Sequence, residues 1–253
     1  MSSSDLRLCI PEPGQTWDDS QLSVLNPCLE NMDALERIQW ALDYLPSQAV
    51  LTSSFGTQSA VMLHMLGQFE NRVPVILIDT GYLFPETYRF IDQMQDRIGF
   101  NLEIYRPALS PAWQEVRHGK LWASGADGIR RYNLMNKVEP MERALADLRV
   151  GTWVSGLRRK QSDSRRDLKL LQRHGQVVKV HPIADWSNRD VHHYLRKFDL
   201  PYHPLWEKGY VSVGDTHTSR PLGDGMDEQD TRFFGLVREC GLHEPENFTA
   251  QQS

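Results

Sequence analysis

Short apolar runs alternate with helical periodicity along most of this 253-residue chain. The apolar runs predict buried strands, because each is short and rich in Val, Ile or Leu. These runs lie at residues 49–52, 73–78, 102–105, 152–155 and 177–180. Apolar residues at helical spacing predict helices at residues 35–45, 61–66, 87–98, 137–148 and 188–197, and Pro46 ends the first of them.

This alternation predicts the α/β class: a single domain with a mostly parallel sheet flanked by helices on both faces. We expect the α/β domain at residues 31–200. Residues 1–30 mix Ser, Pro, Asp and Gln without a clear period and are predicted to be a weakly ordered N-terminal arm. Residues 201–253 form a C-terminal segment, and its Gly- and Asp-rich stretch at 223–230 is predicted to be mobile.

Three predicted strands end in small or polar residues, at 53–56, 79–81 and 155–159. Ligands of parallel α/β sheets bind beyond the carboxyl ends of the strands, so these ends are candidate binding positions. At the second of them, Asp79, Thr80 and Gly81 are placed to contact a ribose or adenine edge. Capping of the following helix remains open as the alternative, above all for Thr80.

The turn after the first strand is typical of an anion-binding loop, because N–H groups at a helix start favour negative charge. Its hydroxyl groups could instead cap the helix that follows. The loop residues are Ser53, Ser54, Phe55, Gly56, Thr57 and Ser59.

A second candidate is the basic stretch at residues 156–170, which holds six basic residues and two acids and follows a strand directly. Arginine forks match phosphate and sulfate oxygens, whereas a solvated basic face is the plainer interpretation. The residues of interest are Gly156, Arg158, Arg159, Arg165 and Arg166.

Composition excludes several classes of protein. The chain has 28 basic and 33 acidic residues, and this net charge of −5 argues against general nucleic-acid binding. Three cysteines without a CxxC motif exclude a disulfide framework and a four-cysteine zinc or iron–sulfur site built by this chain alone. No bilayer-length apolar stretch and no signal peptide are evident, so we expect a cytoplasmic protein without a membrane anchor.

Metal-binding patterns are weak. His192 and His193 are adjacent, there is no HExxH motif, and residues 215–217 (Asp-Thr-His) fit a turn or substrate contact better than a metal site.

Cys240 lies between Arg238 and His243 and is followed directly by Gly241. Neighbouring cations lower the pKa of a thiol, so Cys240 is a candidate nucleophile; a structural role is the alternative. Cys9 and Cys28 lie in the predicted arm and are interpreted as incidental.

Taken together, these motifs resemble the phosphoadenylyl-sulfate (PAPS) reductase family of bacterial sulfate assimilation. The resemblance covers about residues 35–243 and rests on the segments at 53–56, 79–88, 136–140, 156–159, 212–217 and 239–243. It implies an adenine-nucleotide α-hydrolase-like (Rossmann-like) fold. It also implies a homodimer that reduces PAPS to sulfite and adenosine 3′,5′-bisphosphate, with thioredoxin or glutaredoxin as electron donor and no bound cofactor.

The resemblance also implies roles for particular residues. Cys240 is the expected nucleophile and forms an S-sulfocysteine, while His243 and Arg238 are expected to aid it. The loop at residues 53–57 and the residues 79–81 are expected to hold the nucleotide. The anionic reactants require neutralising cations, for which the candidates are Lys137, Arg158, Arg159, Arg165 and Arg166.

Two departures from related families bear on the substrate. The loop at residues 53–59 lacks the lysine of ATP pyrophosphatases, which disfavours pyrophosphate cleavage. The chain also lacks the paired cysteines that hold an iron–sulfur cluster in adenylyl-sulfate reductases, which favours PAPS. The alternatives that stay open are an adenylyl-sulfate reductase without a cluster, an ATP-pyrophosphatase-type enzyme and a non-catalytic nucleotide-binding module.

Overall fold

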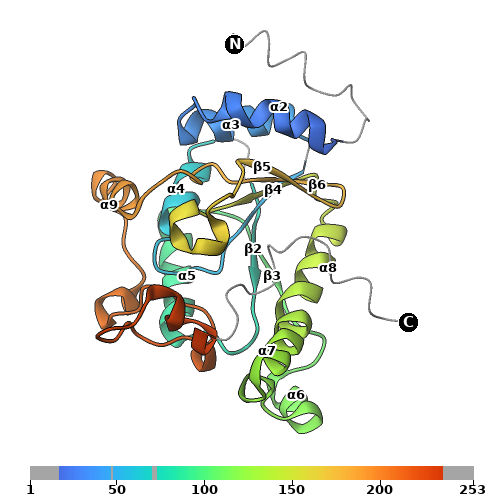
Figure 1. The fold of residues 1–253 in the computed structure, drawn as a ribbon, viewed down its shortest axis with the longest axis vertical. Helices are drawn as coiled ribbons and strands as arrows, with labels where there is room; N and C mark the ends of the chain where they lie inside the picture. The colour runs from blue at the N-terminus through green and yellow to red at the C-terminus, as the bar shows by residue number, and fades with distance from the viewer. Residues whose placement is uncertain (1–16, 47, 70–72, 236–253) are drawn as a thin grey trace. The chain divides into compact units, whose positions relative to one another are not determined.

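The computed structural model describes residues 17–46, 48–69 and 73–235 (Figure 1). Six strands form one sheet in the order β3-β2-β1-β4-β6-β5. The pairs β1–β4, β2–β3 and β4–β6 are parallel, and β5 runs antiparallel to β6. The structure therefore has the predicted α/β class with a mostly parallel sheet.

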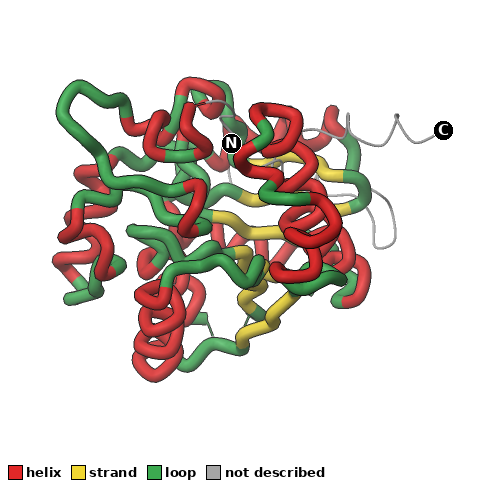
Figure 2. The backbone as a smooth tube through the Cα atoms, turned by 90° about the horizontal axis from the view of Figure 1, so that it is seen from below, coloured by secondary structure: helices red, strands yellow, loops and turns green. Residues whose placement is uncertain are grey.

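Each strand is four residues long; a short turn at residues 175–176 joins β5 to β6, and longer segments, most of them with helices, join the others (Figure 2). The strands are β1 (Ala49–Thr52), β2 (Val75–Ile78), β3 (Leu102–Tyr105), β4 (Thr152–Ser155), β5 (Leu171–His174) and β6 (Val177–Val180). The α-helices are α2 (Asp19–Leu29), α3 (Ala34–Tyr44), α4 (Ala60–Gly67), α5 (Pro85–Ile98), α6 (Pro111–His118), α7 (Gly125–Asn133), α8 (Glu139–Asp147) and α9 (Asn188–Lys197). A π-helix, η2 (Leu134–Val138), joins α7 to α8, and 3-10 turns are η1 (Leu121–Ala123), η3 (Arg159–Gln161), η4 (Asp163–Arg165), η5 (Pro204–Lys208), η6 (Thr216–Thr218), η7 (Glu228–Thr231) and η8 (Phe233–Gly235). Among the described residues, no helix has the length and apolar character needed to cross a membrane.

The chain divides into two compact units. Of the described residues, unit 1 comprises 17–46, 48–52 and 148–190, and unit 2 comprises 53–69, 73–147 and 191–235. Unit 1 contains β1, β4, β6 and β5, and unit 2 contains β2 and β3. The two are described separately below.

The core of unit 1 forms where apolar strands pair in register. Val50 lies opposite Trp153 and Leu51 lies opposite Val154, and all four side chains are buried. Helix α2 is fastened to the edge strand β5 by one side chain, because Asn26 accepts from the N–H of Leu171 at 2.8 Å and donates to its carbonyl at 3.0 Å. The paired amide replaces hydrogen bonds that an edge strand would otherwise leave to water.

The expectation of a weakly ordered arm at residues 1–30 is wrong for residues 19–29, which form α2. Asp18 caps this helix with a capping box, and Leu22, Leu25 and Leu29 are buried on one face. Pro27 within the helix interrupts the helical pattern, since proline lacks the N–H of a regular helix interior. The rest of the predicted arm, residues 1–16, lies outside the described residues.

Unit 2 places helices against β2 and β3. Helix α5 buries Phe90, Ile91 and Met94 on one face, and α8 packs on both strands. Helix α4 is apolar on almost every side, and its six buried residues fill the interior beside α5. The helical path from α7 through η2 into α8 is continuous and carries Lys137 in its π-helical turn.

Candidate active site

The loop after β1 presents unused backbone donors. Among the described residues, the N–H groups of Ser54, Gly56 and Thr57 have no hydrogen-bond acceptor. The neighbouring N–H groups are occupied: Ser53 donates to the carbonyl of Ile76 at 3.0 Å, and Phe55 donates to the hydroxyl of Ser53 at 3.1 Å. Clustered free N–H groups are the feature that binds phosphate and other oxyanions in proteins.

The hydroxyl groups of this loop do not cap α4. Thr57 donates its hydroxyl to the carbonyl of Val211 at 3.0 Å, and Ser59 donates its hydroxyl to the carbonyl of Gly56 at 2.9 Å. Ser59 occupies the N-cap position of α4 without a side-chain cap bond. The helix-capping interpretation of the loop is therefore wrong, and its first amides stay free of side-chain acceptors.

The turn after β2 is organised by Asp79. Its Oδ1 accepts from the N–H of Gly81 at 3.0 Å and from the hydroxyl of Tyr88 at 2.7 Å, and its Oδ2 accepts from Arg106 Nε at 2.9 Å. Burial and the Asp79 carboxylate both raise the pKa of Tyr88 above its ordinary value. Because Asp79 is buried and fully engaged, it shapes the turn that carries Thr80 and Gly81.

Lys137 and Thr80 converge on one carboxylate, that of Asp215. Asp215 Oδ1 accepts from the Thr80 hydroxyl at 2.5 Å, while Oδ2 lies 2.7 Å from Lys137 Nζ and accepts from Tyr132 at 3.1 Å. The carboxylate thus joins three sequence motifs: residues 79–88, 136–140 and 212–217.

The electrostatics of this cluster favour an ionised carboxylate. Burial alone would raise the pKa of Asp215, but Lys137, the Thr80 hydroxyl and Arg232 lower it to about 2. Lys137 Nζ also lies 5.1 Å from the centre of the Phe233 ring. Its ammonium group is therefore held in place with its charge balanced, before any ligand is considered.

An aromatic cluster around His217 borders the same carboxylate. The imidazole stacks on Trp122 at 3.7 Å between ring centres, and the rings of Tyr82 and Tyr132 meet it edge-on at 4.7 and 5.1 Å. Both ring nitrogens are buried without a hydrogen-bond partner among the described residues. Burial lowers the pKa of His217 to about 4, so the ring is neutral near pH 7.

The sequence pointed to only part of this cluster: Tyr82 and His217 lie in the segments at 79–88 and 212–217 that carry the resemblance. Residues 215–217 were considered as a turn or substrate contact, and the structure places 216–218 in the short turn η6. Trp122 and Tyr132 come from η1 and α7, whose sequences contain no motif that marks them. Asp215 carries the largest share of the polar contacts here, yet it was not among the predicted binding residues.

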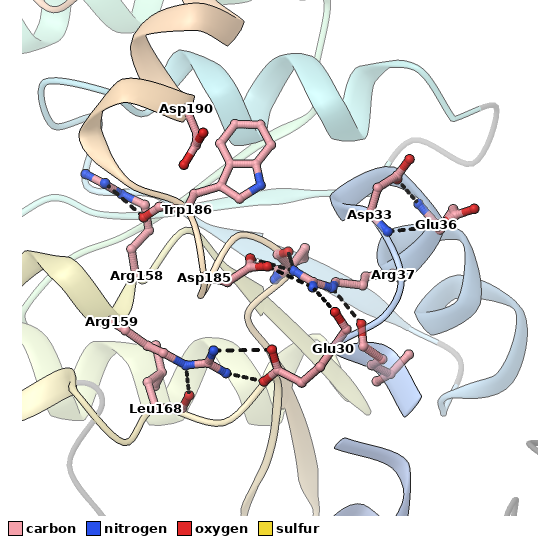
Figure 3. Close-up of polar contacts among 12 residues, drawn as sticks. Glu30, Asp33, Glu36, Arg37, Arg158, Arg159, Leu168, Asp185, Trp186 and Asp190 are labelled. Atoms are coloured by element: carbon pink, nitrogen blue, oxygen red, sulfur yellow. Dashed lines mark hydrogen bonds and ion pairs between the residues drawn. The ribbon is translucent and has the colours of Figure 1, made fainter. Parts of the chain in front are cut away.

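In unit 1, the predicted cation loop is held by its own protein contacts (Figure 3). Arg158 is buried and donates to Asn188 at 3.0 Å and to the Trp186 carbonyl at 3.4 Å. Arg159 pairs with Glu30 through both terminal nitrogens and donates from Nε to the Leu168 carbonyl at 2.8 Å.

A third arginine, Arg37, binds Asp185 and the end of α2, as Figure 3 shows. All donor groups of Arg37 are used: they bind both oxygens of Asp185 at 2.7 and 2.9 Å and three backbone carbonyls. Those carbonyls belong to Leu29, Glu30 and Pro182. The loop contacts the same turn, because the N–H of Arg159 donates to the carbonyl of Ala184 at 2.8 Å, so Arg37 supports the loop indirectly.

Behind the end of β4 lies a buried Ser–His–Gln chain. Ser155 Oγ is 2.7 Å from His181 Nδ1, and His181 Nε2 is 3.2 Å from the amide oxygen of Gln172. The amide oxygen can only accept, so Nε2 carries the proton and Ser155 donates to Nδ1. Burial, with Lys179 and Arg165 nearby, lowers the pKa of His181 to about 3 and keeps the ring neutral.

The remaining predicted cations are more accessible. Arg165 donates to the amide oxygen of Gln161 at 2.6 Å, and Arg166 pairs with Asp163 at 3.0 Å in an exposed contact. Gly156 follows β4 directly and is half-buried. Cys240, His243 and Arg238 lie outside the described residues.

The predicted binding residues thus fall into two sets. Unit 2 contains the loop at residues 53–57, the turn at 79–81 and Lys137, and unit 1 contains Gly156 and the four arginines. Within unit 2, Thr80 and Lys137 share the Asp215 carboxylate. Within unit 1, Arg158 and Arg159 are committed to protein contacts that fix their loop.

A mostly parallel sheet in the order β3-β2-β1-β4-β6-β5 defines an α/β protein of the doubly wound type, a class in which ligands bind beyond the carboxyl ends of the strands. Solved structures share this fold. Candida glabrata FMN adenylyltransferase superposes with a TM-score of 0.56 at 13% identity, covering 88% of this chain and 74% of that one. A phosphoadenylyl-sulfate (PAPS) reductase from Candida auris, solved as a phosphate complex, gives a TM-score of 0.71 at 28% identity, covering 81% of this chain and 99% of that one.

Sequence comparison gives the family. The phosphoadenosine phosphosulfate reductase domain model matches residues 48–221. A phosphoadenosine 5'-phosphosulfate reductase of Shewanella oneidensis is 57% identical over 96% of this chain and 99% of its own length. The protein of the same name from Thiocapsa roseopersicina is 59% identical over 89% of this chain and 95% of its own. The chain belongs to the phosphoadenosine phosphosulfate reductase family.

Proposed function

We propose that this protein reduces 3′-phosphoadenylyl sulfate (PAPS) to sulfite and adenosine 3′,5′-bisphosphate in sulfate assimilation. The observation that carries the proposal is the loop after β1, with unused N–H groups at Ser54, Gly56 and Thr57 among the described residues. A nucleotide with several oxyanions suits such a loop. The names of the relatives in two bacteria support PAPS as the nucleotide.

The first step of the proposed reaction is nucleophilic attack by Cys240. Its thiolate attacks the sulfonate sulfur of PAPS, and a sulfur–sulfur bond forms. The bond between that sulfur and the bridging phosphate oxygen breaks, and its electron pair leaves with adenosine 3′,5′-bisphosphate. Cys240 then carries an S-sulfocysteine, and His243 and Arg238 are proposed to favour the thiolate form of the attacking cysteine.

An external dithiol protein, thioredoxin or glutaredoxin, completes the reaction. One of its thiolates attacks Cys240 Sγ, and sulfite leaves with the electron pair of the sulfur–sulfur bond. The second thiol then resolves the mixed disulfide and restores Cys240. The donor supplies the two electrons. The other cysteines of the chain, Cys9 and Cys28, lie far from Cys240 in the sequence.

Binding of so anionic a substrate requires positive charge and N–H donors. In unit 2, we propose the loop at residues 53–57, the turn at 79–81 and Lys137 as substrate-binding residues. In unit 1, we propose Gly156 and the arginine loop. Arg165 and Arg166 are the better candidates for direct contact with an anion, since Arg158 is buried and Arg159 is paired with Glu30. Arg158 and Arg159 then act by holding the loop in shape.

Two substitutions test the role of Cys240. Cys240→Ser is expected to abolish sulfite formation while PAPS still binds, because the hydroxyl group is a far weaker nucleophile. Cys28→Ser serves as the matched control, since Cys28 lies on α2 and is expected to leave the rate unchanged. Sulfite formation at the wild-type rate in Cys240→Ser would show that the cysteine mechanism is wrong.

Side-by-side assays decide the substrate. We expect sulfite from PAPS at a far higher kcat/KM than from adenylyl sulfate, and no pyrophosphate from ATP. Preference for adenylyl sulfate would identify an adenylyl-sulfate reductase without a cluster. Pyrophosphate release from ATP would instead place the protein with the ATP pyrophosphatases. Light scattering on the same preparation tests the proposed homodimer.

A further inference from the structure

Phe55, in the middle of the loop after β1, has a backbone conformation that phenylalanine rarely adopts. Its φ is +49°, in the left-handed region where a bulky side chain is an outlier. Glycine adopts this region freely, yet the adjacent Gly56 lies outside it. The left-handed position of the loop is therefore taken by Phe55, although a glycine stands next to it.

Packing of the Phe55 ring maintains this conformation. The side chain is completely buried, and its ring centre lies 5.9 Å from that of Phe100, which follows α5. The N–H of Phe55 donates to the Ser53 hydroxyl at 3.1 Å and closes the turn on the other side. A side chain with no exposed surface does not contact a nucleotide, so any role of Phe55 in binding acts through the backbone.

The left-handed residue sets the direction of the N–H groups that follow it. An alternation of left- and right-handed residues turns successive N–H groups toward one side of the chain. The N–H groups of Gly56 and Thr57, directly after Phe55, are among those without an acceptor in the described part of the chain. The strained residue and the free donors are thus consecutive in the loop.

We propose that Phe55 is a positioning residue: its buried ring fixes the left-handed turn that directs the Gly56 and Thr57 N–H groups toward a substrate oxyanion. This inference rests on the proposed function, in which the loop binds PAPS. A glycine would reach the same φ without strain but would leave the loop free to move. The anchored phenylalanine removes that freedom before the substrate binds, which favours affinity.

Substitutions at Phe55 separate the anchor from the backbone conformation. Phe55→Gly keeps access to a positive φ and removes the ring, while Phe55→Leu keeps a buried apolar anchor. We expect Phe55→Gly to raise the KM for PAPS by about tenfold or more with kcat within about threefold, the pattern of lost binding. Phe55→Leu is expected to stay within about threefold of the wild type in both constants.

Phe90→Ala is the matched control for general loosening of unit 2. Phe90 is also completely buried, lies on α5 and packs 5.2 Å from the His203 ring. Its link to the loop runs through His203, whose N–H donates to the Thr57 carbonyl at 3.2 Å and does not involve the Gly56 or Thr57 N–H groups. Phe90→Ala is expected to lower the melting temperature at least as much as Phe55→Gly does and to leave the KM for PAPS unchanged. An unchanged KM in Phe55→Gly, or an equal rise in Phe90→Ala, would overturn the inference.

A measurement without substrate distinguishes this inference from the proposed function. Amide hydrogen exchange at Gly56 and Thr57 in the ligand-free protein is expected to be about tenfold faster in Phe55→Gly than in the wild type. Exchange in Phe90→Ala is expected to stay at the wild-type rate at these two positions. If the wild type does not reduce PAPS, the proposed function fails, and the exchange rates still decide whether Phe55 orders the loop. Equal exchange in Phe55→Gly and the wild type would contradict the inference.

Discussion

Lys137 Nζ lies 2.7 Å from Asp215 Oδ2, and the two side chains are 9% and 1% exposed. The pair links the π-helical turn η2 to the turn at residues 212–217. Thr80 binds the same carboxylate, so the end of β2 depends on this pair as well. Asp215 therefore holds two predicted substrate-binding residues at fixed positions.

Replacement of Asp215 by Asn tests this arrangement. The variant leaves the Lys137 ammonium buried without its counter-charge, which costs about 3–5 kcal/mol of unfolding free energy. Chemical denaturation measures the loss. Glu86→Gln is the control, because Glu86 pairs with the largely exposed Lys208 and its loss is expected to cost less than about 1 kcal/mol. Equal stability of the two variants would contradict the buried-pair interpretation.

The lowered pKa of His181 is expected to make the stability of the protein depend on pH. Burial, with Lys179 and Arg165 nearby, lowers its pKa to about 3 from 6.5, so the unfolded chain binds more protons than the folded one between these values. The stability that His181 contributes is complete above pH 6.5 and is lost as the pH falls toward 3. The expected slope from this residue is about 1.4 kcal/mol per pH unit.

His181→Asn isolates that contribution. Its amide oxygen is placed to accept from Ser155, as Nδ1 does, but it does not titrate. The unfolding free energy of the variant, measured by denaturation at several pH values, is expected to fall less steeply below pH 6.5 than that of the wild type. Parallel curves for the two proteins would show that His181 is not the titrating group.

Much of the fold follows from local sequence. The strand at Ala49–Thr52 and the helix at Ala34–Tyr44 were predicted at nearly these bounds, because each has an uninterrupted apolar pattern. The edge strand Leu171–His174 was not predicted, since only Leu171 is buried and its polar residues carry no alternating pattern. Similarly, the helix at Asp19–Leu29 was not predicted, because Pro27 within it interrupts the helical pattern.

The candidate site was predicted less completely, because its decisive contacts are not local. The pattern of residues 156–166 showed an excess of cations but could not show that Arg159 is paired with Glu30 from α2. Nor does any local pattern join Lys137 to Asp215. The loop at residues 53–57 was predicted from its Ser and Gly content, whereas no local pattern shows that Phe55 has a positive φ or that its ring lies 5.9 Å from that of Phe100.

Gly81 and Gly99 form a matched pair for testing the turn after β2. Both have positive φ, at 76° and 75°. A Cβ at Gly81 would lie 2.6 Å from the Pro111 ring, whereas one at Gly99 would meet nothing within 4 Å. Both alanine variants suffer the left-handed strain of about 1–2 kcal/mol, so any further loss in Gly81→Ala comes from the contact with Pro111.

We expect Gly81→Ala to be destabilised by about 1–3 kcal/mol more than Gly99→Ala, the usual cost of overpacking. Its KM for PAPS is also expected to rise, because the turn carries Thr80 and Asp79. Thermal and urea unfolding, with steady-state kinetics, measure both effects. Equal unfolding free energies and equal KM values for the two variants would show that the contact with Pro111 does not constrain the turn.

Substitution of Arg37 is expected to lower the stability of the protein strongly, although Arg37 has no role in the proposed reaction. Arg37→Met leaves three backbone carbonyls and Asp185 without their donor, and we expect a loss of about 2–4 kcal/mol in urea unfolding. Arg173→Gln removes an exposed pair with Asp19 and is expected to cost less than about 1 kcal/mol. If Arg37→Met loses as little unfolding free energy as Arg173→Gln, the contacts of Arg37 do not secure α2 to the turn at residues 182–185.

In the proposed reaction, Cys240 takes the sulfonate group from PAPS. The most direct test of this step is the intact mass of the full-length protein after incubation with PAPS in the absence of any thiol. We predict one added sulfonate group per chain, located on Cys240 by peptide mapping and released as sulfite when reduced thioredoxin is added. No adduct, or an adduct that persists in Cys240→Ser, would contradict sulfonate transfer to Cys240.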